Sequence, residues 1–188
     1  MRFALGLVHY PMLDREKRIV ATNITNFDIH DIARAATVYG AEKYYLIHPM
    51  HEQLMFVDRV LDHWRVGTGA RYNPYRKIAL ENTKPAETME AAIRDWGYAR
   101  EEVLVIGTHA RPVPSTRSWT CQELKNYIKK DEKPVFLLFG TGYGMTEEYM
   151  QGLDGILESI KGAPPKDFRH LSVRSAVSIY LDRVLGPW

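Results

Sequence analysis

Residues 135–148 read VFLLFGTGYGMTEE and hold the features that decide the fold. Residues 135–139 are the most apolar of the strand candidates, as expected for a strand that is buried on both faces of a parallel sheet. Gly140, Gly142 and Gly144 follow, and two glutamates then stand in the first turn of a short predicted helix. The stretch predicts the strand, turn and helix of an α/β protein.

The same alternation extends in both directions along the chain. Further strands are predicted at residues 3–9, 44–47, 103–106 and 155–160, and helices at residues 26–39, 52–64, 85–96, 121–129 and 172–185. Residues 65–84 are polar and turn-rich. Residues 111–118 carry two prolines and are not predicted to be regular. We expect a mostly parallel sheet with helices on both faces, in one domain spanning residues 1–188.

Composition limits the classes of function. A chain of 188 residues with 45% hydrophobic content can bury a substantial core. The 25 basic and 23 acidic residues nearly balance, so any nucleic-acid site must be a local patch. Cys121 is the only cysteine, which indicates a reducing compartment. We expect a cytoplasmic protein without a signal peptide or membrane span, and no metal site, because the seven histidines lack metal-ligand spacing.

The glycine cluster has two interpretations. Glycines after a buried strand let the backbone approach a ligand closely, but they also suit a tight turn between strand and helix. A P-loop is excluded because Met145 and Thr146 stand where Lys and Ser or Thr are needed. A dinucleotide site is disfavoured because Glu147 and Glu148 already place negative charge at the helix N-terminus.

Arginines interleave with aromatic residues in two stretches, residues 63–77 (HWRVGTGARYNPYRK) and residues 111–119. Arginine binds phosphate and aromatic rings stack on unpaired bases, so single-stranded RNA is one interpretation. An ordinary surface loop or a subunit contact is the other. The residues predicted to bind RNA are Arg65, Arg71, Tyr72, Arg76, Arg111 and Arg117.

Three segments together resemble the SPOUT superfamily of RNA methyltransferases, in the linear order of its ribose 2′-O-methylating branch. They are residues 26–49 (NFDIHDIARAATVYGAEKYYLIHP), residues 135–148, and Ile160 with residues 171–182 (LSVRSAVSIYLD). Residues 107–111 (GTHAR) are similar to a turn that contacts the cofactor in some members. The likeness is greatest to a bacterial group in which some members are fused to a tRNA guanine-N1 methyltransferase.

This resemblance implies an S-adenosylmethionine-dependent methyltransferase that acts as a homodimer on tRNA or rRNA, at a ribose 2′-oxygen or a base nitrogen. It also implies a deep trefoil knot formed by the C-terminal segment, which general topology rules would not predict. By position, the residues implied to contact the cofactor are Thr108, His109, Ala110, Phe139, Gly140, Thr141, Gly142, Ile160, Leu171, Ser172 and Val173.

Two residues are candidates for catalysis, one that matches the family's first motif and one that departs from it. Arg34 matches the arginine of the first motif and suits a clamp on the target phosphate, whereas its helical position alone favours a solvated surface residue. Asp28 stands where that motif usually has asparagine, so a carboxylate is available as general base. Two alternatives stay open: a module that binds the cofactor and RNA without catalysis, and a dinucleotide or flavin enzyme.

Overall fold

The computed structural model describes residues 1–114 and 116–187. Its strands are β1 (Phe3–Val8), β2 (Met12–Leu13), β3 (Ile19–Val20), β4 (Lys43–Ile47), β5 (Thr83–Ala86), β6 (Leu104–Thr108), β7 (Ser118–Trp119), β8 (Val135–Gly140) and β9 (Gly155–Leu157). Its helices are α1 (Asn26–Val38), α2 (His51–Arg65), α3 (Thr68–Tyr72), α4 (Pro74–Leu80), α5 (Met89–Asp95), α6 (Cys121–Lys130), α7 (Glu147–Gln151) and α8 (Val173–Leu185), with a 3₁₀ turn η1 (Arg100–Glu102).

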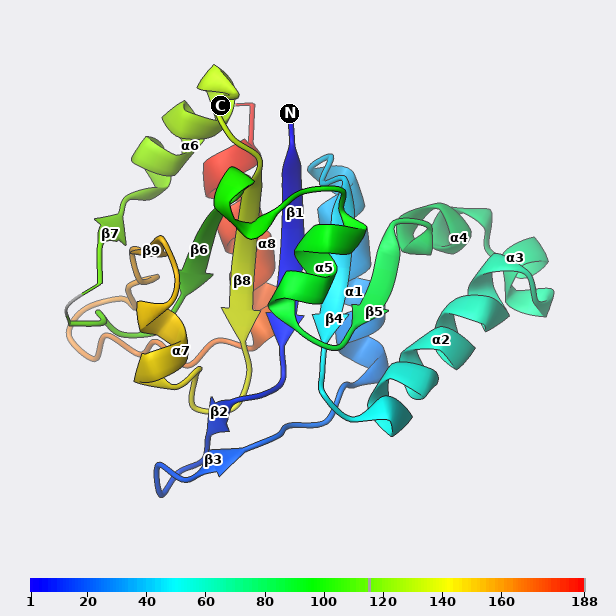
Figure 1. Ribbon diagram of the computed structural model, residues 1–188, viewed down its shortest axis with the longest axis horizontal. Helices are drawn as coiled ribbons and strands as arrows, with labels where there is room; N and C mark the ends of the chain where they lie inside the picture. Colours follow the sequence, from blue (N-terminus) through cyan, green and yellow to red (C-terminus); the bar gives the residue numbers. More distant parts are fainter. Residues whose placement is uncertain (115, 188) are drawn as a thin grey trace.

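Seven strands form one sheet in the order β5-β4-β1-β8-β6-β9-β7, and every pairing between neighbours is parallel. Helices lie on both sides of this sheet (Figure 1). The predicted α/β class is therefore confirmed. The single domain and the knot stay predictions.

Alternation along the strands builds a separate core on each face of the sheet. In β1, Phe3, Leu5 and Leu7 pack with α1, α6 and α8, whereas Ala4 and Val8 pack with α5 and α7 on the other face. All six residues of β1 are buried, because a parallel strand covered by helices on both sides has no solvent face.

The two central strands, β1 and β8, send their connections to opposite faces. The chain leaves β1 toward α1 on one face, and it leaves β8 toward α7 on the other. Such a topological switch point leaves a crevice at the carboxyl ends of the two strands. The fold thereby places a ligand site next to the residues that follow Val8 and Gly140.

The polar, turn-rich stretch at residues 65–84 contains regular elements that sequence analysis did not assign. It contains α3, α4 and the start of β5, which are short elements held by tertiary contacts. Asn73 caps α4 by accepting a hydrogen bond from the Arg76 N–H at 3.0 Å, and Pro74 follows at the first helical position. Local composition signalled turns because both short helices are dense in turn-forming residues.

The predicted helix at residues 85–96 begins later than expected. Pro85 belongs to β5, an edge strand that pairs only with β4, and the helix α5 starts at Met89 behind its cap Thr88. Proline fits an edge strand, because its missing N–H removes no ladder bond on the solvent side. A proline in a first helical turn and a proline in an edge strand look alike in the sequence.

The pair β2–β3 was not predicted. It is a small antiparallel hairpin between β1 and α1, with Met12 opposite Val20 and Leu13 opposite Ile19. Figure 1 places it beyond the carboxyl ends of the central strands, below the sheet. Two residues per strand are too few for a periodic signal, so the hairpin is held by its neighbours.

No described helix is long and apolar enough to cross a lipid bilayer. Among the described residues there is also no group of three or more histidine, cysteine, aspartate or glutamate side chains that could hold a metal ion.

Candidate functional site

A cavity of about 1030 Å³ lies at the switch point. It collects residues from four stretches that are far apart in the sequence: the segment after β1, the turn after β6, the glycine turn after β8, and the segment from Ile160 into α8. Every residue that the family resemblance implied for the cofactor lines it, namely Thr108, His109, Ala110, Phe139, Gly140, Thr141, Gly142, Ile160, Leu171, Ser172 and Val173.

The glycine turn after β8 requires glycine at specific places. Gly142 and Gly144 have φ angles of +56° and +101°, in the left-handed region that other residues avoid. A Cβ on Gly144 would stand 2.7 Å from the His109 ring, and one on Gly140 would stand 3.0 Å from the Met145 side chain. These glycines therefore allow the turn itself to form, which is the second of the two interpretations, and the turn then becomes one wall of the cavity.

The β2–β3 hairpin is bonded to this turn. The Leu13 N–H donates to the Gly144 carbonyl at 2.9 Å, and the Tyr143 N–H donates to the Leu13 carbonyl at 3.1 Å. Met12 and Met145 form a further antiparallel bridge and are fully buried. The hairpin and the glycine turn therefore form one bonded unit at the edge of the cavity.

Behind this unit lies a chain of side-chain hydrogen bonds. His9 Nδ1 and Thr22 Oγ1 are 3.0 Å apart, and Thr22 Oγ1 and Thr141 Oγ1 are 2.5 Å apart. Burial, with a contribution from His48, lowers the pKa of His9 to about 3, so the ring is neutral at physiological pH. Neutral His9 fixes the loop carrying Thr22 against Thr141 in the cavity wall.

Asp28 reaches the cavity from the first turn of α1 and is 7% exposed. Thr25 is the N-cap of α1, and its hydroxyl donates to Asp28 Oδ2 at 2.5 Å. The Arg174 guanidinium lies 4.0 Å from Asp28 Oδ1. The two contacts hold the Asp28 carboxylate in one orientation toward the cavity.

Arg34 lies outside the cavity. It is two turns further along α1, its side chain is 55% exposed, and it pairs with Asp31 on the same helix. The two predicted catalytic residues are therefore separated, with Asp28 in the cavity of this chain and Arg34 on its surface.

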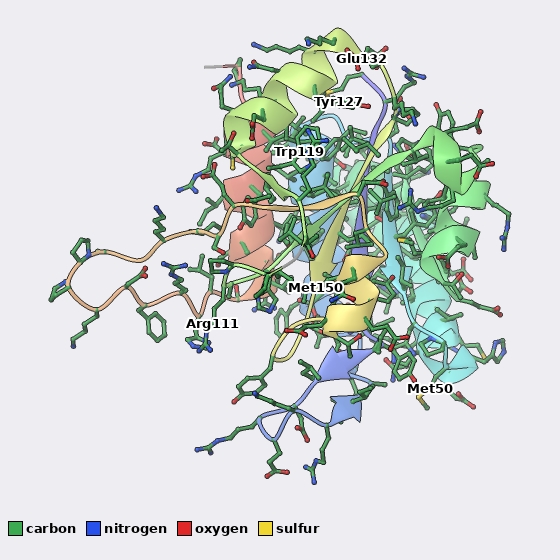
Figure 2. The ribbon with its side chains drawn as sticks, turned by 60° about the vertical axis from the view of Figure 1, so that its left-hand side comes forward. Met50, Arg111, Trp119, Tyr127, Glu132 and Met150 are labelled. Carbon is green, nitrogen blue, oxygen red and sulfur yellow. The ribbon has the colours of Figure 1, made fainter. Side chains whose placement is uncertain are left out.

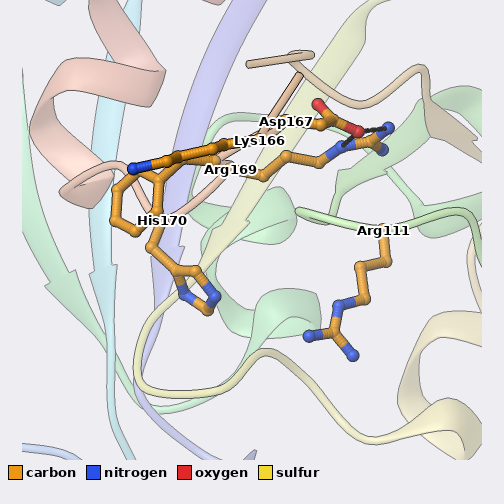
Figure 3. A pocket seen from close by; sticks show the side chains of 6 residues that line it. Arg111, Lys166, Asp167, Arg169 and His170 are labelled. Atoms are coloured by element: carbon orange, nitrogen blue, oxygen red, sulfur yellow. Dashed lines mark hydrogen bonds and ion pairs between the residues drawn. The ribbon is translucent and has the colours of Figure 1, made fainter. Parts of the chain in front are cut away.

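The cavity is also lined by basic side chains that sequence analysis did not select. Arg15 and Lys17 come from the hairpin, and Arg169 and His170 come from the segment before α8. Arg111, which was predicted, also lines the cavity. A smaller cavity of about 450 Å³ adjoins these side chains, and Figure 3 shows Arg169 turned toward Asp167 there. In Figure 2 the segment before α8 extends away from the body, with Arg111 at its base.

The remaining residues predicted to bind RNA have different environments. Arg65 donates from its guanidinium to the carbonyls of Leu80, Glu81 and Thr83, so it serves the packing of α2 on α4 and β5. The guanidinium of Arg76 lies 4.3 Å from the centre of the Trp64 ring, and that of Arg117 lies 4.2 Å from the Trp119 ring.

Two rings on the α3–α4 arm are free for contact. Tyr72, which was predicted, is 89% exposed, and Tyr75, which was not, is 85% exposed. Arg71 is exposed beside them. Tyr75 stands in the same basic and aromatic stretch as Tyr72, so the pattern that selected Tyr72 could also have selected Tyr75.

The residues that sequence reasoning missed follow β1 or precede α8. Arg15 and Lys17 belong to the charged run REKR at residues 15–18, which looks like any solvated turn. Arg169 and His170 follow two prolines in a segment that has no periodic pattern. A residue-type signal existed in both cases, but the position of each segment beside the glycine turn depends on the folded sheet.

The chemistry of the cavity fits an amphipathic ligand that carries charged groups of both signs. Phe139, Ile160 and Val173 offer apolar wall, and the glycine turn offers bare backbone. Asp28 and Glu147 add carboxylates to the same cavity, which would favour a sulfonium or ammonium group. These residues therefore fit S-adenosylmethionine, which joins an adenosine to a cationic sulfonium.

A family model described as SAM-dependent RNA methyltransferase matches residues 2–186. An uncharacterized protein of Aquifex aeolicus is 38% identical over 183 residues, which are 97% of this chain and 87% of that protein. A tRNA (guanine-N(1)-)-methyltransferase of Nitratidesulfovibrio vulgaris is 38% identical over 182 residues, 96% of this chain and 41% of that protein. The chain thus spans well under half the length of that enzyme.

A solved structure with a similar fold is the SpoU methyltransferase AviRb of Streptomyces viridochromogenes in complex with the cofactor AdoMet. Its TM-score is 0.54 at 13% identity, and the match covers 97% of this chain and 56% of that one. At this identity the likeness concerns the fold alone.

Proposed function

The chain belongs to the family of SAM-dependent RNA methyltransferases, in agreement with the SPOUT resemblance, and we propose that it methylates a nucleotide of tRNA or rRNA as a cytoplasmic homodimer. The observation that carries this proposal is the meeting of four distant stretches in one cavity at the switch point of the sheet. The dinucleotide and flavin alternatives lose their support, because the family that matches uses S-adenosylmethionine.

In this proposal the cofactor is held by the turn after β6, the glycine turn after β8 and the segment that begins α8. When bound, S-adenosylmethionine supplies an activated methyl group. The chain therefore needs to orient an RNA oxygen or nitrogen at close range and to keep water out, and positioning of this kind dominates the rate. Phe139, Ile160 and Leu171 supply the apolar surface for that exclusion.

Asp28 is our candidate for the proton acceptor. It is the buried carboxylate of the cavity, its orientation is fixed by Thr25, and it lies on the same wall as Thr25 and Asn23, which also line the cavity. In this proposal the carboxylate takes the proton from the RNA atom that is methylated.

Arg34 is our candidate for a clamp on the target phosphate, and its position makes the homodimer part of the proposal. The side chain is exposed and outside the cavity of its own chain, so it can assist methyl transfer only at a cavity completed by a second copy. A planar guanidinium would then hold two phosphate oxygens at once.

The test combines binding and transfer. Calorimetry with S-adenosylmethionine, S-adenosylhomocysteine, FMN and NAD should show binding of the first two only. Transfer of labelled methyl from S-adenosylmethionine to tRNA or rRNA, followed by mass spectrometry of nucleosides, then identifies the modified atom. Cofactor binding without transfer to any RNA would instead support a module that has lost catalysis.

A further inference from the structure

The tip of the β2–β3 hairpin, residues 14–18, stands at the mouth of the cofactor cavity. Arg15 and Lys17 line that cavity together with the glycine turn, and both are exposed. Neither has an ion-pair partner within 4.0 Å among the described residues, whereas the neighbouring Arg18 pairs with Asp14 and Glu16. Two unneutralised cations therefore face the site where an RNA acceptor would enter.

The tip has a defined conformation. The Asp14 carboxylate accepts hydrogen bonds from the N–H groups of Glu16 and Arg18, at 2.8 and 2.9 Å, and the Lys17 N–H donates to the Asp14 carbonyl at 3.1 Å. Such a turn presents its side chains in a fixed direction, as binding of a phosphate requires.

Lys17 stands at a position where glycine would be the easier choice. Its φ angle is +63°, in the left-handed region, and short hairpin loops usually place glycine at such a position. A non-glycine residue here is strained, and strain of this kind tends to occur at functional sites. Glycine adopts this conformation without strain, so Lys17→Gly removes the side chain while the turn is kept.

The hairpin is also attached to the wall of the cofactor cavity. Its backbone is bonded to the glycine turn through Leu13, Tyr143 and Gly144, so the tip is positioned by the same turn that lines the cofactor cavity. Across the cavity, Arg111 and Arg169 offer further positive charge, although Arg169 is paired with Asp167. The mouth of the cavity is therefore cationic on both sides.

We propose that Arg15 and Lys17 bind the phosphates beside the nucleotide that is methylated, so that the hairpin is an RNA-binding arm tied to the cofactor turn. This inference rests on the proposed function, since it names how the same site holds its RNA. The phosphodiester backbone is the ligand, and the carboxylate of S-adenosylmethionine is the competing anion that the experiment must separate.

The test compares Lys17→Gly, Arg15→Ala and the double variant with a control, Lys129→Ala with Lys130→Ala. The control lysines are exposed at the end of α6, next to Asp131. Asp131 pairs with Arg2, which precedes β1, so the control lies at the amino ends of the strands, opposite the cavity. Each protein is measured for melting temperature, for affinity to S-adenosylmethionine by calorimetry, and for affinity to bulk tRNA and to a short single-stranded RNA by fluorescence anisotropy over a range of salt.

We expect Lys17→Gly to melt at the same or a higher temperature, because glycine relieves the strain. Cofactor affinity should be unchanged. RNA affinity of the double variant should fall at least about tenfold, and the slope of log affinity against log salt should become shallower by about one to two, as for the loss of one or two phosphate contacts. The control should match the wild-type protein.

Two results would overturn the inference while the proposed function stands: unchanged RNA affinity in a double variant of a protein that methylates RNA, or a loss confined to cofactor affinity. If the wild-type protein binds S-adenosylmethionine but neither binds nor methylates RNA, the proposed function and the inference fail together.

Discussion

Two regions of the molecule differ in the surroundings of their predicted residues. One is the cavity edge, at the carboxyl ends of the central strands, and the other is the α3–α4 arm, residues 68–80. At the cavity edge, residues selected from four distant stretches line one cavity. On the arm, Arg65 is bound to three backbone carbonyls and Arg76 lies on Trp64. The contrast shows that a site made by strand ends follows from the order of the strands, whereas the role of an arginine depends on what its side chain meets.

At the cavity edge, we expect Asp28→Asn to cause the largest loss of methyl-transfer rate. Loss of a general base typically costs a factor of about a hundred or more, or about 2.7 kcal/mol of transition-state stabilisation. Single-turnover methyl transfer should show that loss, while calorimetry shows cofactor affinity within a factor of about two. The defect should shrink as pH rises, because hydroxide substitutes for the base. Equal rates for the variant and the wild-type protein would exclude Asp28 as the proton acceptor.

Gly144→Ala, with Gly152→Ala as its matched control, tests the glycine turn. A methyl group on Gly144 would meet His109 at 2.7 Å with φ at +101°, whereas one on Gly152 would meet only the Tyr149 carbonyl at 3.5 Å. We expect the first variant to weaken cofactor binding at least tenfold, about 1.4 kcal/mol, and to lower the free energy of unfolding by about 1–3 kcal/mol. Calorimetry and chemical denaturation measure the two quantities. Comparable affinities for the two variants would contradict this account of the turn.

On the arm, two variants should have opposite effects on stability and on RNA binding. They are Arg65→Ala and the double variant Tyr72→Ala with Tyr75→Ala. Loss of the Arg65 guanidinium leaves buried carbonyls without their charged donor, so stability should fall by about 1.5–3 kcal/mol in urea denaturation. Loss of the exposed rings should leave stability unchanged and weaken single-stranded RNA binding by about 1–3 kcal/mol per stacked base. If the arginine variant and the tyrosine double variant weaken RNA binding equally without a change in stability, the distinction between packed and free residues on the arm is wrong.

Arg34→Ala tests the surface between the two regions. A clamp on the target phosphate predicts at least about a tenfold loss of methyl transfer, near 1.4 kcal/mol, with fold and cofactor affinity kept. A solvated arginine predicts a change in stability of no more than about 0.5 kcal/mol and full activity. Lysine at this position should rescue the clamp only in part. Light scattering checks the predicted homodimer, and a monomer at micromolar concentration would count against a site shared by two copies.

The last prediction concerns pH and His9, which lies behind the cavity wall. Burial lowers the pKa of His9 to about 3, so between that value and about 6.5 the unfolded chain takes up a proton that the folded chain does not. Stability should therefore fall as pH decreases through this window, by up to about 1.4 kcal/mol per pH unit from this group. His9→Asn keeps a polar group toward Thr22 without titrating and should flatten the dependence. Denaturation from pH 4 to 7 measures how the free energy of unfolding changes with pH. An equal slope in the wild-type protein and in His9→Asn would show that groups other than His9 cause the acid sensitivity.

Most of the fold could be predicted because the strands are apolar runs and the helices have periodic apolar faces. β1, β4, β6, β8 and the helices α1, α2, α6 and α8 stand where the pattern placed them. The prediction was wrong at Pro85, which belongs to a strand paired with β4. It also did not include α3 and α4, and α4 is held by a hydrogen bond from Arg65 to the Leu80 carbonyl. The residues that the family resemblance implied for the cofactor line one cavity, whereas the charged side chains of the hairpin that line it too were not selected.

The sequence by itself determined the α/β alternation, the buried central strand and the glycine turn, because apolar periodicity and glycine placement act over short distances. Only the tertiary structure decided that Asp28 lies in the cavity while Arg34 lies outside it, and that Lys17 lies beside the turn carrying Gly144. Those relations join residues far apart in the chain. They depend on strand order and on the directions of side chains, and local pattern fixes neither.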